Sequence, residues 1–269
     1  MEDRRKHIAS GLAAESLVAK RVAQATEGKA RPILPDLWLI MIGGSLFDRG
    51  REAMIPLAER LVALRRTYPL AASCGGGVRQ RHTYKIGLDL GLPLGGLAAV
   101  ALPVEEQNAL MLWALTAQGG AIRLNNEQLE LLPMALGIGQ MPILIAQPPY
   151  RYWEYPREGS GLPLHGDDCG TVLLAENFGC KCVLLKDVDG VYEADPAEHP
   201  EARRMKHARI DDLLVTGPRT LPVERGLLEI MRHTRHVTRV CIASGLDPDN
   251  LDRILAGEAV GTVLEGSHA

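Results

Sequence analysis

Three short segments of the chain share one pattern, an apolar run of strand length that leads into glycine. These are 38–42 before Gly43, Gly44 and Ser45, 70–74 before Gly75, Gly76 and Gly77, and 182–185 before the turn of Asp189 and Gly190. In a parallel sheet the carboxyl ends of the strands meet at one edge, and ligands bind there. Glycine lets the backbone approach a phosphate closely and leaves N–H groups facing it. A single glycine cluster is more often a simple turn, but three at strand ends predict a phosphate or anion site.

Segments with the apolar periodicity of amphipathic helices separate these runs. The pattern predicts helices over 52–66, within 82–118, and over 168–178, 227–236 and 250–255, with further strands at 121–124, 142–146, 240–243 and 261–264. No element is predicted in the charged, proline-broken segment 197–224. The alternation of strands and helices favours a mainly parallel sheet with helices on both faces.

Residues 1–31 differ from the rest of the chain because they are polar and contain no core-forming strand. Only the stretch 12–25 has helical character. We expect an N-terminal arm here that becomes ordered against a partner subunit. The remaining residues, 32–269, are predicted to form a single domain, since their number suits one large α/β domain.

The composition and the missing motifs exclude several classes of protein. The formal net charge is -3, so we expect no nucleic-acid partner, and no apolar run reaches the ~18 residues of a membrane span. The five cysteines are odd in number and scattered, without a secretory signal, which favours buried thiols in the cytoplasm. There is no Walker A motif, no GxGxxG after the first strand, no HExxH and no GxSxG. P-loop kinases, dinucleotide-binding enzymes, zinc peptidases and α/β-hydrolases therefore have no support.

The segment 147–167 holds four prolines and four of the chain's aromatic residues. A loop of this composition is either a surface excursion or a functional segment. Because Tyr, Trp and Arg dominate interface hot spots, the composition favours a buried, anchored contact rather than a free loop. The side chains concerned are Tyr150, Arg151, Tyr152, Trp153, Glu154 and Tyr155.

The segment 186–196, KDVDGVYEADP, resembles the signature of the amino acid kinase superfamily, which includes UMP kinases, aspartokinases and N-acetylglutamate kinases. The order of the motifs also resembles that of the superfamily, since two glycine clusters precede Asp168 at the start of a predicted helix. Within the superfamily the chain is most similar to the subunits of bacterial molybdenum storage proteins, which are relatives of UMP kinase. The matching motifs are GVRQRH (77–82), GLDLGLP (87–93), PPY (148–150), RHV (235–237) and the tail from 245 to 262. The resemblance covers residues 32–264.

This resemblance implies a three-layer α/β/α sandwich with a mainly parallel central sheet. It places ATP over the C-terminal half of the domain, with Mg²⁺, and an anion or acceptor phosphate near the N-terminal half. It implies a hexameric cage, built as a homo-oligomer or as a hetero-oligomer with a related subunit. On this basis we predict that the aromatic side chains of the loop 147–167 line an inner wall or a subunit boundary rather than a lid over the protein's own core. The cargo would be molybdate or tungstate, condensed inside the cage into a polyoxometalate cluster.

The resemblance also assigns roles to individual residues, each beside a plainer interpretation. Asp168 would be catalytic and help to position Mg²⁺, or would simply favour the helix dipole. The nucleotide-binding residues would be Gly43, Gly44, Ser45, Lys186, Asp187, Asp189, Gly190, Tyr192, Asp195 and Pro196, although 189–190 and 195–196 also suit ordinary turns. The anion- or acceptor-binding residues would be Gly75, Gly76, Gly77, Arg79, Arg81 and His82, although the three basic side chains also suit a solvated edge. The residues that ligate an oxide cluster stay unassigned.

The chain departs from the superfamily at two cations. The first strand normally ends in Lys-x-Gly-Gly, and here Met41 stands in place of that lysine. A second lysine, expected just inside the helix near Leu228, is missing, and Met231 stands about there. Because phosphoryl transfer depends on charge neutralisation, weak ATPase activity is the expected consequence. Three functions remain open: a storage subunit, a UMP kinase-type phosphotransferase, and a regulatory nucleotide-binding subunit.

Overall fold

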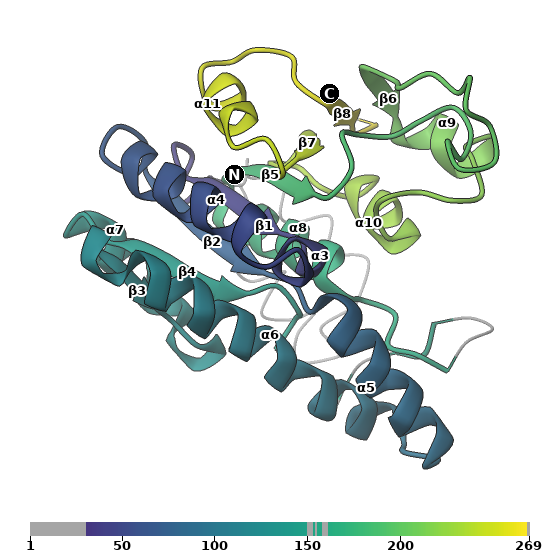
Figure 1. The fold of residues 1–269 in the computed structure, drawn as a ribbon, viewed down its shortest axis with the longest axis horizontal. Coiled ribbons are helices and arrows are strands. Elements are labelled where there is room, and N and C mark those ends of the chain that lie inside the picture. The colour runs from purple at the N-terminus through teal and green to yellow at the C-terminus, as the bar shows by residue number, and fades with distance from the viewer. Residues whose placement is uncertain (1–30, 150–152, 154, 158–160, 268–269) are drawn as a thin grey trace, which may run out of the picture. The chain divides into compact units, whose positions relative to one another are not determined.

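An eight-stranded sheet forms the centre of the computed structural model, which describes residues 31–149, 153, 155–157 and 161–267 (Figure 1). The strand order is β3-β4-β2-β1-β5-β7-β8-β6. The strands are β1 (Trp38–Ile42), β2 (Leu70–Cys74), β3 (Ala121–Arg123), β4 (Met141–Ile145), β5 (Lys181–Lys186), β6 (His207–Arg209), β7 (Arg239–Ser244) and β8 (Thr262–Glu265). All neighbours run parallel except β7 and β8, which confirms the mainly parallel sheet.

The register brings the predicted glycine segments to one edge. In the centre of the sheet, Ile42 of β1 pairs with Cys74 of β2 on one side and with Leu185 of β5 on the other. The three strands therefore end at the same level. The residues that follow them are the two glycine clusters and the segment after Lys186, so three stretches far apart in sequence meet at the carboxyl edge.

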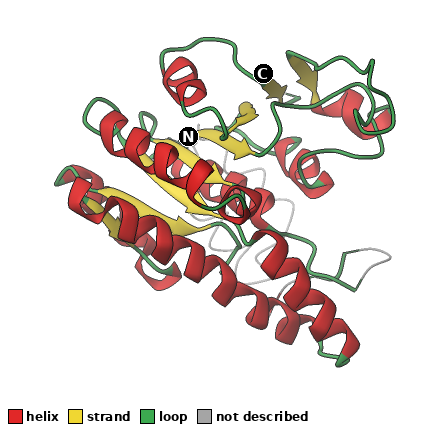
Figure 2. Ribbon diagram, in the orientation of Figure 1, coloured by secondary structure: helices red, strands yellow, loops and turns green. Residues whose placement is uncertain are grey.

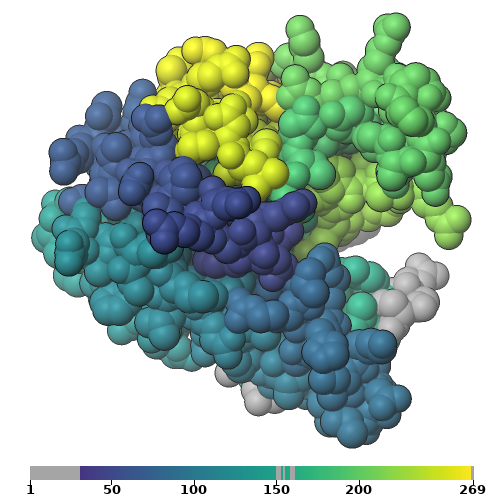
Figure 3. All heavy atoms as spheres, in the orientation of Figure 1, coloured from purple at the N-terminus to yellow at the C-terminus, as the bar shows by residue number. Residues whose placement is uncertain are grey.

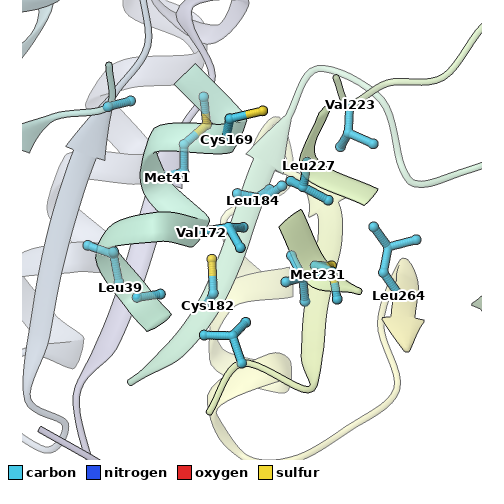
Figure 4. Packing of buried hydrophobic residues seen from close by; sticks show 14 of the residues in the cluster. Leu39, Met41, Cys169, Val172, Cys182, Leu184, Val223, Leu227, Met231 and Leu264 are labelled. Atoms are coloured by element: carbon cyan, nitrogen blue, oxygen red, sulfur yellow. The ribbon is translucent and has the colours of Figure 1, made fainter. Parts of the chain in front are cut away.

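Helices cover both faces of the sheet and complete three layers (Figure 2). The α-helices are α3 (Gly44–Asp48), α4 (Arg51–Leu64), α5 (Gly77–Asp89), α6 (Leu94–Thr116), α7 (Leu132–Gly137), α8 (Asp167–Phe178), α9 (Ile210–Val215), α10 (Arg225–Met231) and α11 (Asp249–Leu255). Side chains alternate across β1, so Leu39 and Met41 pack with α8 and α10 while Ile40 and Ile42 pack with α4 and α6. Figure 4 shows the first of these two cores, in which Met41 lies beside Cys169 and Leu184.

Two expectations about the C-terminal half need correction. The segment 197–224 contains β6 and α9, although no element is predicted there. The strand β6 has three residues, and only Ala208 is buried. One apolar residue between two polar ones is too short a pattern to predict a strand. The helix predicted over 227–236 instead spans Arg225–Met231, and beyond it the Thr234 hydroxyl lies within hydrogen-bond distance of the backbone oxygens of Met231 (3.0 Å) and Val237 (2.7 Å).

The predicted N-terminal arm lies outside the described residues, apart from Arg31, and so do Tyr150, Arg151, Tyr152 and Glu154. All five cysteines are free thiols and four of them are buried, as expected. Among the described helices, none has the length and apolar character needed to cross a bilayer.

Candidate functional site

A cleft of about 1040 Å³ lies at the carboxyl edge of β1 and β5. Its walls are α5 on one side and the segment 219–229 on the other, with 162–168 between them. In the space-filling view the surface is hollowed between α5 and the green segment that follows α9 (Figure 3). Residues that line the cleft include Met41, Gly43, Gly44, Ser45, Gly77, Arg81, Tyr84, Arg157, Asp167, Asp168, Lys186, Arg219, Glu224 and Arg225.

The two glycine loops touch each other, and this contact forms the floor of the cleft. A Cβ on Gly44 would lie 1.9 Å from the Gly77 backbone nitrogen, so only glycine fits there. Gly77 itself has φ of 72°, which glycine adopts without strain. A Cβ on Gly75 would lie 2.5 Å from the Asp167 carboxylate. The glycines are therefore required for the close packing of the two loops.

Asp168 and Lys186 form an ion pair in the cleft, with 2.5 Å between Nζ and Oδ1. Both side chains are largely buried, at 14% exposure for the lysine and 5% for the aspartate. Burial alone would lower the pKa of Lys186, but the charge and hydrogen bond of Asp168, with Asp167 and Glu224 nearby, raise it above its ordinary value. The ammonium group therefore stays charged where an anionic ligand would enter.

Glu224 holds Asp168 in place through an exchange of hydrogen bonds. The Glu224 backbone N–H donates to Asp168 Oδ2 at 3.1 Å, and the Glu224 carboxylate accepts the N–H groups of Gly166 and Asp168 at 2.9 and 3.4 Å. Arg157 approaches the same carboxylate at 3.7 Å. Burial, with the charges of Asp168 and Asp167, raises the pKa of Glu224 to about 7. The starts of α8 and α10 thus stabilise each other.

Four arginines stand around the cleft, and we call them the arginine rim: Arg81, Arg157, Arg219 and Arg225. The sequence pointed only to Arg81, because the other three lie in segments without a recognisable element. Guanidinium groups bind phosphate and other oxyanions through paired hydrogen bonds. Asp167, Asp168 and Glu224 also line the cleft, and carboxylates beside a cationic rim suit a polyanion that arrives with a divalent cation.

The other two basic residues of the predicted acceptor group lie elsewhere. Arg79 donates to Gln107 at 2.8 Å and to Asn108, so its guanidinium is bound to α6. His82 lines a separate, open groove of about 720 Å³ along α5, together with Lys85. Of the predicted acceptor-side residues, only Gly77 and Arg81 line the cleft.

The predicted nucleotide-binding residues fall into two places. Gly43, Gly44, Ser45 and Lys186 line the cleft, and the Ser45 hydroxyl donates to Asp187 at 2.9 Å. Asp189 instead lines a smaller cavity of about 250 Å³ with Arg204 and Arg253. Four further members of this group belong to local turn structure. Gly190 is buried at φ of 146°, Tyr192 donates to Asp189 at 2.7 Å, and Asp195, which precedes Pro196, accepts the Ala197 N–H at 2.9 Å.

Within the described ranges, no group of three or more His, Cys, Asp or Glu side chains is placed to hold a metal ion. Both carboxylate oxygens of Asp168 already have partners, Lys186 and the Glu224 N–H. A divalent cation would therefore need most of its ligands from phosphate oxygens and water, as Mg²⁺ commonly does in nucleotide sites.

The fold thus places two glycine loops at the carboxyl edge, with the Lys186–Asp168 pair beside the first of them. The family model "Amino acid kinase family" matches residues 142–244. Over 237 residues the chain is 38% identical to the molybdenum storage protein subunit beta of Azotobacter vinelandii, which covers 87% of this chain and 88% of that protein. The chain belongs to the amino acid kinase family, and its resemblance to molybdenum storage protein subunits is confirmed.

Two further relatives are uridylate kinases. The enzyme of Methanothermobacter thermautotrophicus is 27% identical over 84% of this chain and 98% of its own length. The crystal structure of the Archaeoglobus fulgidus enzyme superposes with a TM-score of 0.68 over 84% of this chain and 99% of that chain, at 20% identity. At that identity the superposition shows the shared fold and confirms the three-layer sandwich.

Proposed function

We propose that this chain is an ATP-binding subunit of a cage that stores molybdate or tungstate as a polyoxometalate cluster. The observation that carries the proposal is the 38% identity to a molybdenum storage protein subunit over 87% of the chain. The cleft supports it, since its volume of about 1040 Å³ has room for a nucleoside triphosphate beside an oxyanion, and the arginine rim supplies positive charge.

In this proposal Lys186 binds the phosphate oxygens of ATP, and Asp168 fixes the lysine through its ion pair. The backbone of 43–45 lies next to the phosphates, and the Asp189–Gly190 turn shapes the side that receives the nucleoside. Mg²⁺, bound by the phosphates with Asp168 close by, would supply charge neutralisation. Met41 contributes no cation, so hydrolysis by this chain is expected to be slow.

Assembly forms the second part of the proposal. Trp153 and Tyr155 lie on the loop 147–167 and are 78% and 72% exposed in the single chain. We propose that they become covered at a subunit boundary or inner wall of a hexamer, formed with copies of this chain or with a related subunit in the cytoplasm. Trp153→Ala should then change assembly or cargo loading and leave ATP affinity unchanged, which size-exclusion mass and calorimetry would measure.

The direct test of storage is elemental analysis of protein purified from cells grown with molybdate and, separately, with tungstate. The proposal predicts many metal atoms per subunit in at least one preparation, in an assembly of hexamer mass. A monomer with metal at background level in both would contradict it. A Trp153→Ala preparation, analysed in parallel, shows whether the amount of bound metal depends on this loop.

A UMP kinase-type phosphotransferase is the second candidate, favoured by the uridylate kinase that is 27% identical over 98% of its own length. This function predicts that the purified chain alone converts UMP and ATP to UDP and ADP. Formation of UDP without metal storage would replace the first proposal. Binding of ATP with neither activity would leave the regulatory nucleotide-binding subunit.

A further inference from the structure

Glu105 is a carboxyl group buried in the middle of α6, with 0% of its surface exposed. It lines neither the cleft nor the two smaller cavities, although it lies directly behind the glycine floor. Most buried neighbours along α6, such as Leu102, Ala109 and Leu112, are aliphatic. A carboxyl group in such surroundings is costly unless hydrogen bonds satisfy it, so its partners show what it does.

The first partner of Glu105 is the start of the loop 147–167. The Gln147 backbone N–H donates to Glu105 Oε2 at 2.7 Å. The second partner is the other end of the same loop, where Asp167 forms a side-chain hydrogen bond with Glu105. Gln80 of α5 donates to Oε1. One side chain thus joins both ends of the loop to two helices.

Asp167 passes this connection on to the second glycine cluster. Its Oδ2 accepts the Gly76 N–H at 2.8 Å. One turn after Glu105, Asn108 Nδ2 donates to the Gly75 carbonyl oxygen at 2.6 Å. Two neighbouring residues on one face of α6 therefore hold the glycine loop from behind, one of them through Asp167.

A hydrogen bond between two carboxyl groups needs one proton between them. Burial raises the pKa of both carboxyl groups, and that of Glu105 well above its ordinary range, so the pair holds a proton at neutral pH. Burial, with the charges of Glu105 and Asp167, also raises the pKa of the nearby Tyr84 and Cys74 side chains.

We propose that Glu105 is a positioning residue that fixes the two ends of the loop 147–167 and, through Asp167, the glycine loop 75–77 in a single arrangement. Glu105 thereby links Gln147 and Asp167, at the two ends of the loop, to the glycine floor. The consequence for anion binding rests on the proposed function of the cleft, whereas the anchoring of the loop does not.

Three variants separate this role from simple packing. Glu105→Ala removes the hydrogen bonds to Gln80, Gln147 and Asp167. Glu105→Gln keeps an amide donor for Asp167 and an oxygen for the Gln147 N–H, while the Gln80 amide can turn to accept. Leu112→Ala makes a comparable deletion in the same helix, away from both loops.

The measurement is the rate of trypsin cleavage of the native protein after Arg157, divided by the rate of cleavage after Arg239. Arg239 lies in β7, so we expect cleavage there only after global unfolding. For Glu105→Ala we expect this ratio to rise at least about tenfold, and for Glu105→Gln and Leu112→Ala to stay within about threefold of the wild type. The affinity for molybdate, measured by calorimetry, should fall at least about tenfold only in Glu105→Ala. An unchanged ratio in Glu105→Ala would overturn the anchoring, and a raised ratio with unchanged molybdate affinity would overturn the link to the glycine loop.

Hydrogen exchange in the wild type and in Glu105→Gln gives a result even where Glu105→Ala does not fold. The amides of Gly76 and Gln147 should exchange as slowly as that of Ala72 in β2. Exchange as fast as at the exposed Val188 would contradict the inference. A wild-type protein that binds neither molybdate nor ATP would overturn the proposed function alone, since cleavage and exchange are measured without ligand.

Discussion

The two sides of the carboxyl edge are built in different ways. On the N-terminal side the glycine loops 43–45 and 75–77 pack backbone to backbone, and Asp167 accepts the Gly76 N–H while Asn108 donates to the Gly75 carbonyl oxygen. On the C-terminal side Gly190 is buried, but the Asp189 side chain before it lies near solvent and forms an ion pair with Arg204 at 3.8 Å. The glycine loops are part of the core, whereas the Asp189 side chain lies on the surface.

This difference teaches where binding and stability are coupled. A buried network leaves unsatisfied polar groups when one member is removed, so a change there affects folding and ligand together. Exposed ion pairs contribute little to stability, so a change at the turn affects mainly the ligand. The following predictions test that contrast, beginning with the largest expected effect.

Gly44→Ala should destabilise the protein most. Its Cβ would lie 1.9 Å from the Gly77 nitrogen and 2.4 Å from the Gly76 carbonyl carbon. Both are backbone atoms, so no change of side-chain rotamer can relieve the overlap. We expect a loss of about 4 kcal/mol or more in the free energy of unfolding, measured by urea denaturation. Gly137→Ala is the matched control, because a Cβ there meets nothing within 4 Å. Equal effects of the two substitutions would show that the glycine loops are not tightly packed.

Lys186→Met tests the ion pair on the boundary between the two sides. The substitution leaves the buried Asp168 carboxyl group without its cation, and we expect a loss of about 3 kcal/mol in the free energy of unfolding together with loss of ATP binding. The double variant Lys186→Met, Asp168→Asn should lose less stability than the two single variants added together, by at least about 1 kcal/mol. Strict additivity in urea denaturation would mean that the pair contributes nothing.

Met41→Lys should increase ATP hydrolysis at least about tenfold, or about 1.4 kcal/mol in the barrier. The Met41 side chain ends near Gly75, where Asp167 also ends, so an ammonium group would reach the glycine floor. Met41→Leu is the control and should leave hydrolysis unchanged. If phosphate release is the same in all three proteins, the missing lysine does not limit turnover.

Asp189→Asn should have the smallest effect on stability, within about 0.5 kcal/mol, because the side chain is 52% exposed. The affinity for ATP should nevertheless fall several-fold in calorimetry, since the turn shapes the nucleotide side. Glu198→Gln, an exposed change in the following segment, should alter neither quantity. Unchanged ATP affinity in Asp189→Asn would remove the turn from the binding site.

The sequence predicted the fold well where the pattern was long or punctuated by glycine. The runs at 38–42 and 70–74 and the helix around 168–178 were recognisable because buried strands and amphipathic helices have fixed periods. The strand His207–Arg209 was not, since it buries only Ala208 and depends on pairing with β8. Short elements of this kind are determined by tertiary contacts rather than by local preference.

The candidate site was predictable only in part, for a related reason. Glycines, Asp168 and Lys186 follow strands or begin a helix, so their position at the edge followed from the order of elements. Glu105 and Glu224 gave no such signal, because a glutamate in a helix or a loop is normally solvated. Their roles arise from burial beside Asp167 and Asp168, which only the folded chain brings about.

The most direct test of the central claim is ATP-dependent loading of the purified, metal-free assembly. The protein is incubated with molybdate, with and without ATP and Mg²⁺, passed through a gel-filtration column and analysed for molybdenum. The account predicts many molybdenum atoms per subunit in the high-mass fraction with ATP, and a small fraction of that amount without it. Background molybdenum in both samples, with UDP formed from UMP in a parallel assay, would contradict the storage function and identify a kinase.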